Sequence, residues 1–118
     1  MPTLFERIAA GELPADIVYK DAEITAFRDI HPRAPVHILI VPNKPIPTAN
    51  DIEDADAPLI GRLFLVARDL ARKLGIADDG YRLIINCNRH GGQEVYHLHV
   101  HLIGGAPLGM MAGRDDHS

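Results

Sequence analysis

Cysteine and long apolar runs are both scarce in this sequence. Cys87 is the only cysteine among the 118 residues, which excludes an internal disulfide and a cysteine-based metal cluster. No apolar stretch approaches the roughly 20 residues that a membrane-spanning helix needs. The N-terminal segment MPTLFERIAA lacks the apolar core of a signal peptide. We therefore expect a cytoplasmic protein with no membrane partner.

An excess of positive charge is also lacking. The formal net charge is -4, whereas proteins that bind duplex nucleic acid carry a basic face, so we expect no nucleic-acid partner. A small anionic ligand stays compatible with this charge, because backbone amides and histidines can bind phosphate locally. The length of 118 residues and the apolar fraction of 47% predict a single domain over residues 1–118 with a real core, in which 110–118 form a C-terminal tail.

The apolar pattern predicts two helices and five strands. Thr3 and Glu6 fit a capping box before a short helix that carries Phe5 and Ile8 on one face. A long helix is expected from about Asp54 to Leu74, where apolar residues recur at helical spacing. The predicted strands are 15–20, 23–29, 36–42, 81–86 and 95–102. This order of elements predicts an α+β fold, in which the helices pack on a mainly antiparallel, five-stranded sheet.

Three histidines alternate with aliphatic residues in YHLHVHL, residues 96–102. On a strand, this alternation places His97, His99 and His101 on one face. One interpretation is a zinc site made by two of them with His37, although no Asp or Glu alternates with the histidines to support such ligands. Another is a polar strand face without a function. The third is imidazole chemistry, in which a neutral middle histidine is the nucleophile and its neighbours assist with protons and charge.

The loop before these histidines favours the third interpretation. Gly91 and Gly92 allow the backbone to approach a ligand closely, and successive amides in such a turn can bind an anion. Gln93 adds a neutral hydrogen-bond donor. The loop and the histidines together therefore indicate a phosphate site.

Four stretches are similar to one known family, in its order and at its usual spacing. GGQEVYHLHVHLIGG resembles the His-x-His-x-His motif of the histidine triad superfamily, in the form found in its HINT branch of nucleotide-binding phosphoramidases. The others are LPADIVYKD, AFRDIHPRAPVHILIVPNKPI and DDGYRLIINCNRHGGQ. The resemblance covers nearly all of residues 3–109. It implies a homodimer whose two sheets join into one continuous sheet, with a nucleoside monophosphate site on each subunit.

The resemblance also implies roles for individual residues. His99 would attack the α-phosphorus and form a nucleotidyl-histidine intermediate. His97 would orient His99 and link to His37, and His101 would contact phosphate oxygens. The positions implied to bind substrate are Asn86, Gly92 and Gln93 at the phosphate, Asp29 at the ribose hydroxyls, and Phe5, Ile8, Phe27 and Ile30 around the base. Glu94 takes a position linked to the leaving amine, which it would reach by its carboxyl group or by its backbone amide.

The hypothesis from the sequence is hydrolysis of purine nucleoside 5′-phosphoramidates, in which an AMP–amine P–N bond breaks, with acyl-adenylates as a further substrate. No cofactor is expected, since the nucleophile is a side chain. No structural zinc is expected either, because Thr3 and Glu6 stand where some relatives have a Cys-x-x-Cys pair. Two alternatives are a purine nucleotide-binding regulatory or scaffold protein with little turnover, and a zinc hydrolase.

Overall fold

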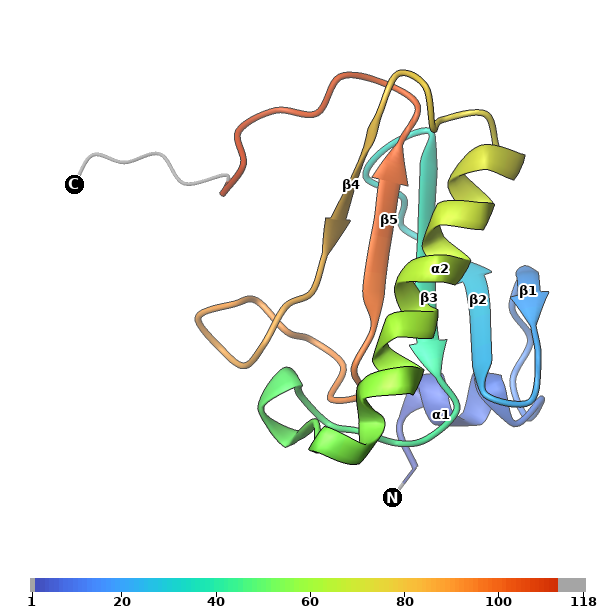
Figure 1. The fold of residues 1–118 in the computed structure, drawn as a ribbon, viewed down its shortest axis with the longest axis vertical. Helices are drawn as coiled ribbons and strands as arrows, with labels where there is room; N and C mark the ends of the chain where they lie inside the picture. The colour runs from blue at the N-terminus through green and yellow to red at the C-terminus, as the bar shows by residue number, and fades with distance from the viewer. Residues whose placement is uncertain (1, 113–118) are drawn as a thin grey trace.

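Five antiparallel strands form one open sheet, which separates a long helix from a short one (Figure 1). The computed structural model describes residues 2–112, so most of the predicted tail, 113–118, lies outside the described residues. The strand order is β1-β2-β3-β5-β4. The elements are α1 (Leu4–Ala9), β1 (Ile17–Lys20), β2 (Ile24–Arg28), β3 (Val36–Pro42), α2 (Ala57–Lys73), β4 (Tyr81–Ile84), β5 (Val100–Gly104) and two short 3-10 turns at Ala49–Asp51 and Asp54–Asp56. The predicted α+β fold is confirmed.

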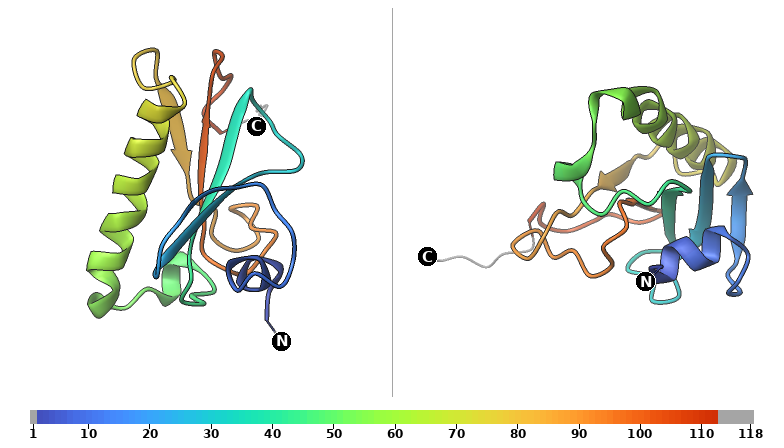
Figure 2. Two further views of the ribbon diagram at one scale, coloured as in Figure 1. Left: turned by 90° about the vertical axis from the view of Figure 1, so that its right-hand side faces the viewer. Right: turned by 90° about the horizontal axis from the view of Figure 1, so that it is seen from below.

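The long helix α2 covers one face of the sheet (Figure 2). Its apolar stripe, which includes Leu63, Val66 and Leu70, packs on the alternating side chains of β2, β3 and β5 to form the main core. Leu98, Val100 and Leu102 point into this core and are almost completely buried. Gly75, with a φ of 76°, ends the helix in the left-handed conformation that glycine adopts most readily. Among residues 2–112, no helix is both long and apolar enough to cross a membrane.

The short helix α1 lies across the opposite face of the sheet (Figure 2). The predicted capping box is present: the Thr3 hydroxyl accepts the backbone N–H of Glu6, and the Glu6 carboxylate accepts the backbone N–H of Thr3. Phe5 and Ile8 are buried against Phe27, Leu39 and Val41 in a second, smaller core. Because α1 is only six residues long, it leaves part of this face open.

The last strand begins later than the alternation predicts. β3 and β5 are paired with Ile40 opposite Val100. Two residues further along the ladder, Leu98 would lie opposite Pro42. Proline has no N–H to donate, so the ladder stops there. The N–H of Leu98 instead bonds the carbonyl of Ile46 at 2.7 Å. The prediction of a strand over 95–102 was therefore wrong for 95–99, although the alternation of buried faces persists through that segment.

Candidate active site

A cavity of about 820 Å³ opens on the α1 side of the sheet. Its lining brings together most of the side chains that the sequence singled out, from α1, β3, β5 and the Gly-rich loop. The predicted site residues that line it are Phe5, Asp29, His37, Asn86, Gly92, Glu94, His99 and His101. The predicted site residues outside this lining are Ile8, Phe27, Ile30, Gln93 and His97.

His99 presents one ring nitrogen to the cavity and anchors the other. Its Nδ1 lies 2.7 Å from the backbone carbonyl oxygen of His97. A carbonyl only accepts, so Nδ1 carries the ring proton and Nε2 has a free lone pair. Every fully buried polar side-chain atom of the described residues has a hydrogen-bond partner. The Nε2 atom of His99 has no such partner among these residues, so it is not fully buried. The lone pair is therefore accessible from the cavity.

His101 presents the opposite tautomer. The backbone N–H of Arg33 donates to Nδ1 of His37 at 3.0 Å, so the proton of His37 is on Nε2. That Nε2 lies 2.9 Å from Nδ1 of His101, which accepts the proton. His101 must then carry its own proton on Nε2, the nitrogen left to the cavity. The cavity thus holds a bare nitrogen and an N–H donor on two rings whose centroids are 4.9 Å apart.

The expected link between His97 and His37 is not present. His97 is 0% exposed and lies behind His99, beside the start of α1. Its Nε2 is 2.7 Å from the carbonyl oxygen of Pro42, and its Nδ1 is 3.2 Å from the Thr3 hydroxyl. The expectation was wrong because β3 and β5 place His37 across the sheet from Ile103, within reach of His101 and away from His97.

Burial keeps the imidazoles of the site neutral. It is the main cause that lowers the pKa of His37, His97 and His99 from the ordinary value of 6.5. Burial, helped by the nearby His99 and His37, lowers the pKa of His101 to about 4. Asp29 opposes this shift at His101, but its effect is smaller than that of burial. Unprotonated nitrogen is therefore available at neutral pH.

The Gly-rich loop is held in a tight conformation beside the cavity. A Cβ on Gly91 would lie 2.5 Å from the backbone oxygen of Cys87, so only glycine fits there, and Gly92 has a φ of 78°. The amide nitrogen of Asn86 donates to the Gly91 carbonyl at 2.6 Å. This bond leaves the amide oxygen of Asn86 and the loop backbone at the cavity.

The buried Gln93 side chain holds the loop through hydrogen bonds of its amide group. Its amide oxygen accepts the N–H of Asn88 at 2.9 Å, and its amide nitrogen donates to the carbonyls of Pro47 and Val95. Both hydrogens of the amide are used, and the side chain is buried. The expectation that this side chain contacts phosphate is therefore corrected: it braces the loop that does line the cavity.

Of the four apolar residues expected around a base, only Phe5 lines the cavity. Its ring meets His99 edge to face, with centroids 4.9 Å apart. Ile8 and Phe27 pack beneath it in the smaller core, so they support the wall without forming it. Ile30 is 83% exposed and lies outside the lining. Ile8 and Phe27 are therefore core residues behind the wall, and a contact of Ile30 with the base stays a prediction from the resemblance.

One cluster has the residue types of a metal site. Ligand atoms of Asp29, His37 and His101 lie within 4.8 Å of one another, so the carboxylate missing from the histidine strand comes from the end of β2. The hydrogen bonding does not suit a metal. A neutral histidine that binds a metal through Nε2 carries its proton on Nδ1. In His37 that nitrogen faces the backbone N–H of Arg33, which would place two hydrogens against each other.

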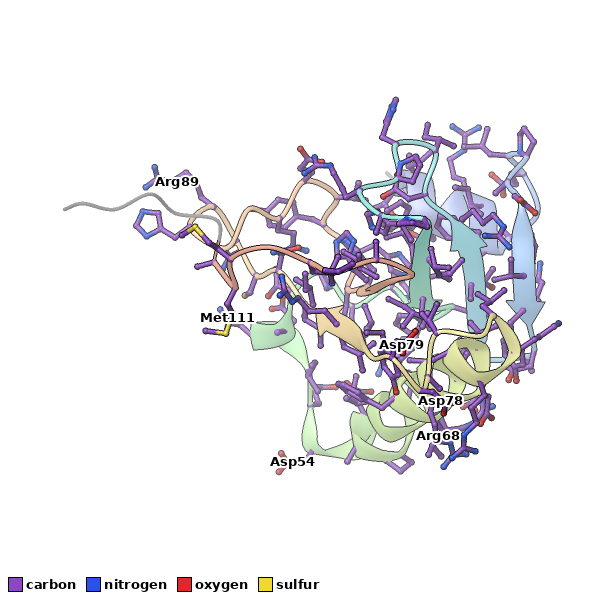
Figure 3. The ribbon with its side chains drawn as sticks, turned by 90° about the horizontal axis from the view of Figure 1, so that it is seen from above. Asp54, Arg68, Asp78, Asp79, Arg89 and Met111 are labelled. Carbon is purple, nitrogen blue, oxygen red and sulfur yellow. The ribbon has the colours of Figure 1, made fainter. Side chains whose placement is uncertain are left out.

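The sequence reasoning missed several residues of the site. Arg33 and His31 line the cavity, although neither was predicted as a site residue from the sequence. Their position just before the His37 strand was a signal that could have been used. Met110 and Met111 also line the cavity, and Figure 3 shows Met111 on the same side of the molecule as Arg89 of the Gly-rich loop, away from Arg68. The segment that carries these methionines follows β5 and is bonded to β4, since the Arg82 guanidinium donates to the carbonyls of Gly109 and Met110.

Comparison with known proteins identifies the family of this chain. The HIT domain family matches residues 10–108. A protein of Escherichia coli (strain K12) named purine nucleoside phosphoramidase is 59% identical over 109 residues, which are 92% of each chain. A crystal structure of a HIT family hydrolase from Legionella pneumophila Philadelphia 1 superposes with a TM-score of 0.91 at 49% identity, covering 93% of this chain and 98% of that one. The structure of a histidine triad protein from Clostridium difficile superposes with a TM-score of 0.90 at 40% identity, covering 93% of this chain and 96% of that one. The resemblance predicted from the sequence is confirmed, and the chain belongs to the HIT domain family.

Proposed function

We propose that this protein hydrolyses the P–N bond of purine nucleoside 5′-phosphoramidates, such as AMP joined to an amine. The observation that carries the proposal is the pair of complementary nitrogens in one cavity: bare Nε2 of His99 and protonated Nε2 of His101. A protein that only binds nucleotides would not need a buried, oriented nucleophile beside a donor. The high identity to the phosphoramidase of Escherichia coli supports the same reaction.

In the first step, Nε2 of His99 attacks the α-phosphorus and the P–N bond of the substrate breaks. The N–H of His101 donates to a phosphoryl oxygen, whose charge grows in the transition state. The amine leaves with one added proton, taken from the solvent side of the cavity, where the exposed Glu94 lies. The product is a nucleotidyl-histidine on His99, whose Nδ1 proton stays bonded to the His97 carbonyl.

In the second step, water attacks the same phosphorus. The bond between phosphorus and Nε2 of His99 breaks, the nucleoside monophosphate leaves, and the water gives up one proton. Splitting the hydrolysis into two displacements is the advantage of a covalent nucleophile. His99 ends the cycle neutral, as it began, so the reaction needs no cofactor.

The remaining lining residues provide binding groups for the nucleotide. The Asp29 carboxylate accepts the backbone N–H of His31 at 2.8 Å, and its other oxygen lies 3.4 Å from Nε2 of His37. Its remaining lone pairs can accept hydrogen bonds from ribose hydroxyls. Asn86 and Gly92 lie at the phosphate end with the histidines. Phe5 provides the apolar surface on which a purine can pack. Acyl-adenylates share the AMP half and fit the same groups.

Incubation of the purified protein with an AMP–amine conjugate tests this function. We expect release of AMP from the unaltered protein and no release from His99→Ala, with AMP affinity retained. Binding without release by the unaltered protein would instead favour a regulatory nucleotide-binding role. Loss of activity after exhaustive chelation, with recovery on zinc, would favour the zinc hydrolase.

We also propose that the protein is a homodimer joined through β4. This strand lies at the edge of the sheet, where unpaired backbone groups can pair with a second copy. Tyr81 and Ile85, at the two ends of this edge, are 36% and 39% exposed. A cytoplasmic location stays a prediction from the sequence.

A further inference from the structure

We infer that Thr3 is a positioning residue for the nucleophile: its hydroxyl holds the buried ring of His97, and the main-chain carbonyl of His97 sets the tautomer of His99. The catalytic consequence rests on the proposed function. The hydrogen bonds of Thr3 and His97 do not depend on the proposed function, so the positioning role and the proposed function can be tested separately. Thr3 lies outside the cavity lining and acts only through its neighbours.

The first step of the argument is a count of protons at His97. Its Nε2 faces the Pro42 carbonyl at 2.7 Å, which only accepts, so Nε2 carries the proton. Burial lowers the pKa of His97, so the ring is neutral near pH 7 and Nδ1 is an acceptor. The only donor recorded for that nitrogen, among residues 2–112, is the Thr3 hydroxyl at 3.2 Å.

The second step is a count at Thr3 itself. Its oxygen accepts the backbone N–H of Glu6 at 3.1 Å, as the cap of α1. A hydroxyl has a single hydrogen, and accepting the N–H leaves that hydrogen free to go to His97. One side chain therefore begins the helix and pairs the buried imidazole, so the start of α1 and the ring of His97 are held together.

The third step leads from His97 to His99. The ring of His97 is held on one side by Pro42 and on the other by Thr3, so its main chain has little freedom to rotate. The carbonyl of that main chain accepts from Nδ1 of His99 at 2.7 Å. Phe5, two residues after Thr3, packs edge to face on His99. The first turn of α1 therefore holds both rings.

Without the hydroxyl, Nδ1 of His97 would be a buried acceptor with no donor. The ring would turn toward another partner and carry its carbonyl with it. His99 would then be free to place its proton on Nε2, where no lone pair remains for attack. We expect kcat to fall on the order of 10- to 100-fold, as for other supporting residues. KM is expected to stay within about twofold, because Thr3 does not line the cavity.

The experiment uses the full chain and an AMP–amine conjugate. Thr3→Val removes the hydroxyl at constant shape, and Thr3→Ser restores it. Thr25→Val is the control: it removes a hydroxyl that is even more buried than that of Thr3 and bonds Asn43 at 2.7 Å, on β2 and outside the cavity lining. Besides kcat, KM and the unfolding temperature, ¹⁵N chemical shifts of the imidazoles report the tautomers of His97 and His99 directly.

The inference is supported if Thr3→Val lowers kcat and adds an Nε2-protonated population of His99, while Thr3→Ser and Thr25→Val do neither. It is overturned if Thr3→Val retains kcat while folded, or if Thr25→Val loses as much. If Thr3→Val does not fold, the spectrum of the unaltered protein decides: a proton on Nδ1 of His97 or on Nε2 of His99 overturns it. If no AMP is released at all, the proposed function fails, and the spectra still test the hydrogen bonds.

Discussion

Nε2 of His37 lies 2.9 Å from Nδ1 of His101, on the neighbouring strand of the sheet. The backbone N–H of Arg33 places the proton of His37 on the shared side. His37 therefore determines which nitrogen of His101 carries a proton into the cavity. Two strands and one loop cooperate to make His101 a donor.

Replacement of His37 by Leu should lower kcat on the order of 10- to 100-fold, because His101 would no longer be held in the donor tautomer. The change is measured by steady-state kinetics on an AMP–amine conjugate. His90→Ala is the control, since His90 is exposed in the Gly-rich loop and outside the cavity lining. An unaltered kcat in His37→Leu would contradict the role given to this pair.

The rate should depend on pH through the nucleophile. Burial lowers the pKa of His99 below 6.5, so Nε2 stays unprotonated at neutral pH and protonates only in acid. We expect kcat/KM to be level around neutrality and to fall roughly tenfold per pH unit below the pKa of His99. A rate that rises on acidification from neutral pH would show that the reactive form of His99 is the imidazolium.

Stability should also fall in mild acid. The folded pKa values of the four site imidazoles lie below 6.5, and that of His101 is about 4, whereas the unfolded chain titrates near 6.5. Below 6.5 the unfolded state therefore binds more protons, and the free energy of unfolding decreases as the pH falls toward about 4. Above pH 6.5 the histidines cause no such loss of stability.

Urea unfolding across this range measures the effect. His101→Gln should make the decrease shallower, and His31→Gln, at an exposed position, should not. A further loss is expected near pH 3.8 and below, where Asp21 takes up a proton in the unfolded chain while the bond from Arg62 holds its pKa in the folded protein well below the ordinary value. A free energy of unfolding that is constant between about pH 6.5 and 4 would contradict neutral burial of the histidines.

Two glycine substitutions should have opposite signs. Gly91→Ala places a Cβ 2.5 Å from the Cys87 oxygen, so we expect a loss of about 1–3 kcal/mol and a lower rate as the loop shifts. Gly61→Ala lies within α2 with no atom within 4 Å of the added Cβ, and should gain roughly 0.5–1 kcal/mol. Urea unfolding of both variants measures these changes in the free energy of unfolding. Equal effects would mean that the loop is not tightly packed.

Sedimentation velocity should find a dimer that depends on β4. Ile85→Asp, just beyond the end of β4, is expected to shift the protein toward monomer, because it places charge in the proposed interface. Ile17→Asp is the matched control, since Ile17 has a similar exposed fraction of 40% on β1, at the opposite edge of the sheet. A monomer before any substitution, or equal dissociation by both variants, would argue against pairing through β4.

Local patterns predicted the elements well. The capping box of Thr3 and Glu6, the helical spacing before Gly75 and the strand-like segment 36–42 all depend on residues near in the chain, and each is present in the structure. The start of β5 was mispredicted, because the ladder ends at a proline 56 residues earlier, at Pro42 against Leu98. Period-two alternation cannot report what stands opposite on another strand.

By itself, the sequence determined the fold, the family and the shared face of the three histidines, since a strand-like alternation places every second side chain on one side. The tertiary structure decided what each histidine meets on that side. Helix α1 covers His97 but leaves His99 at the cavity lining, and β3 brings His37 to His101. The physical reason is that the proton on each ring follows the nearest donor or acceptor, and those groups come from Thr3, Arg33 and Pro42.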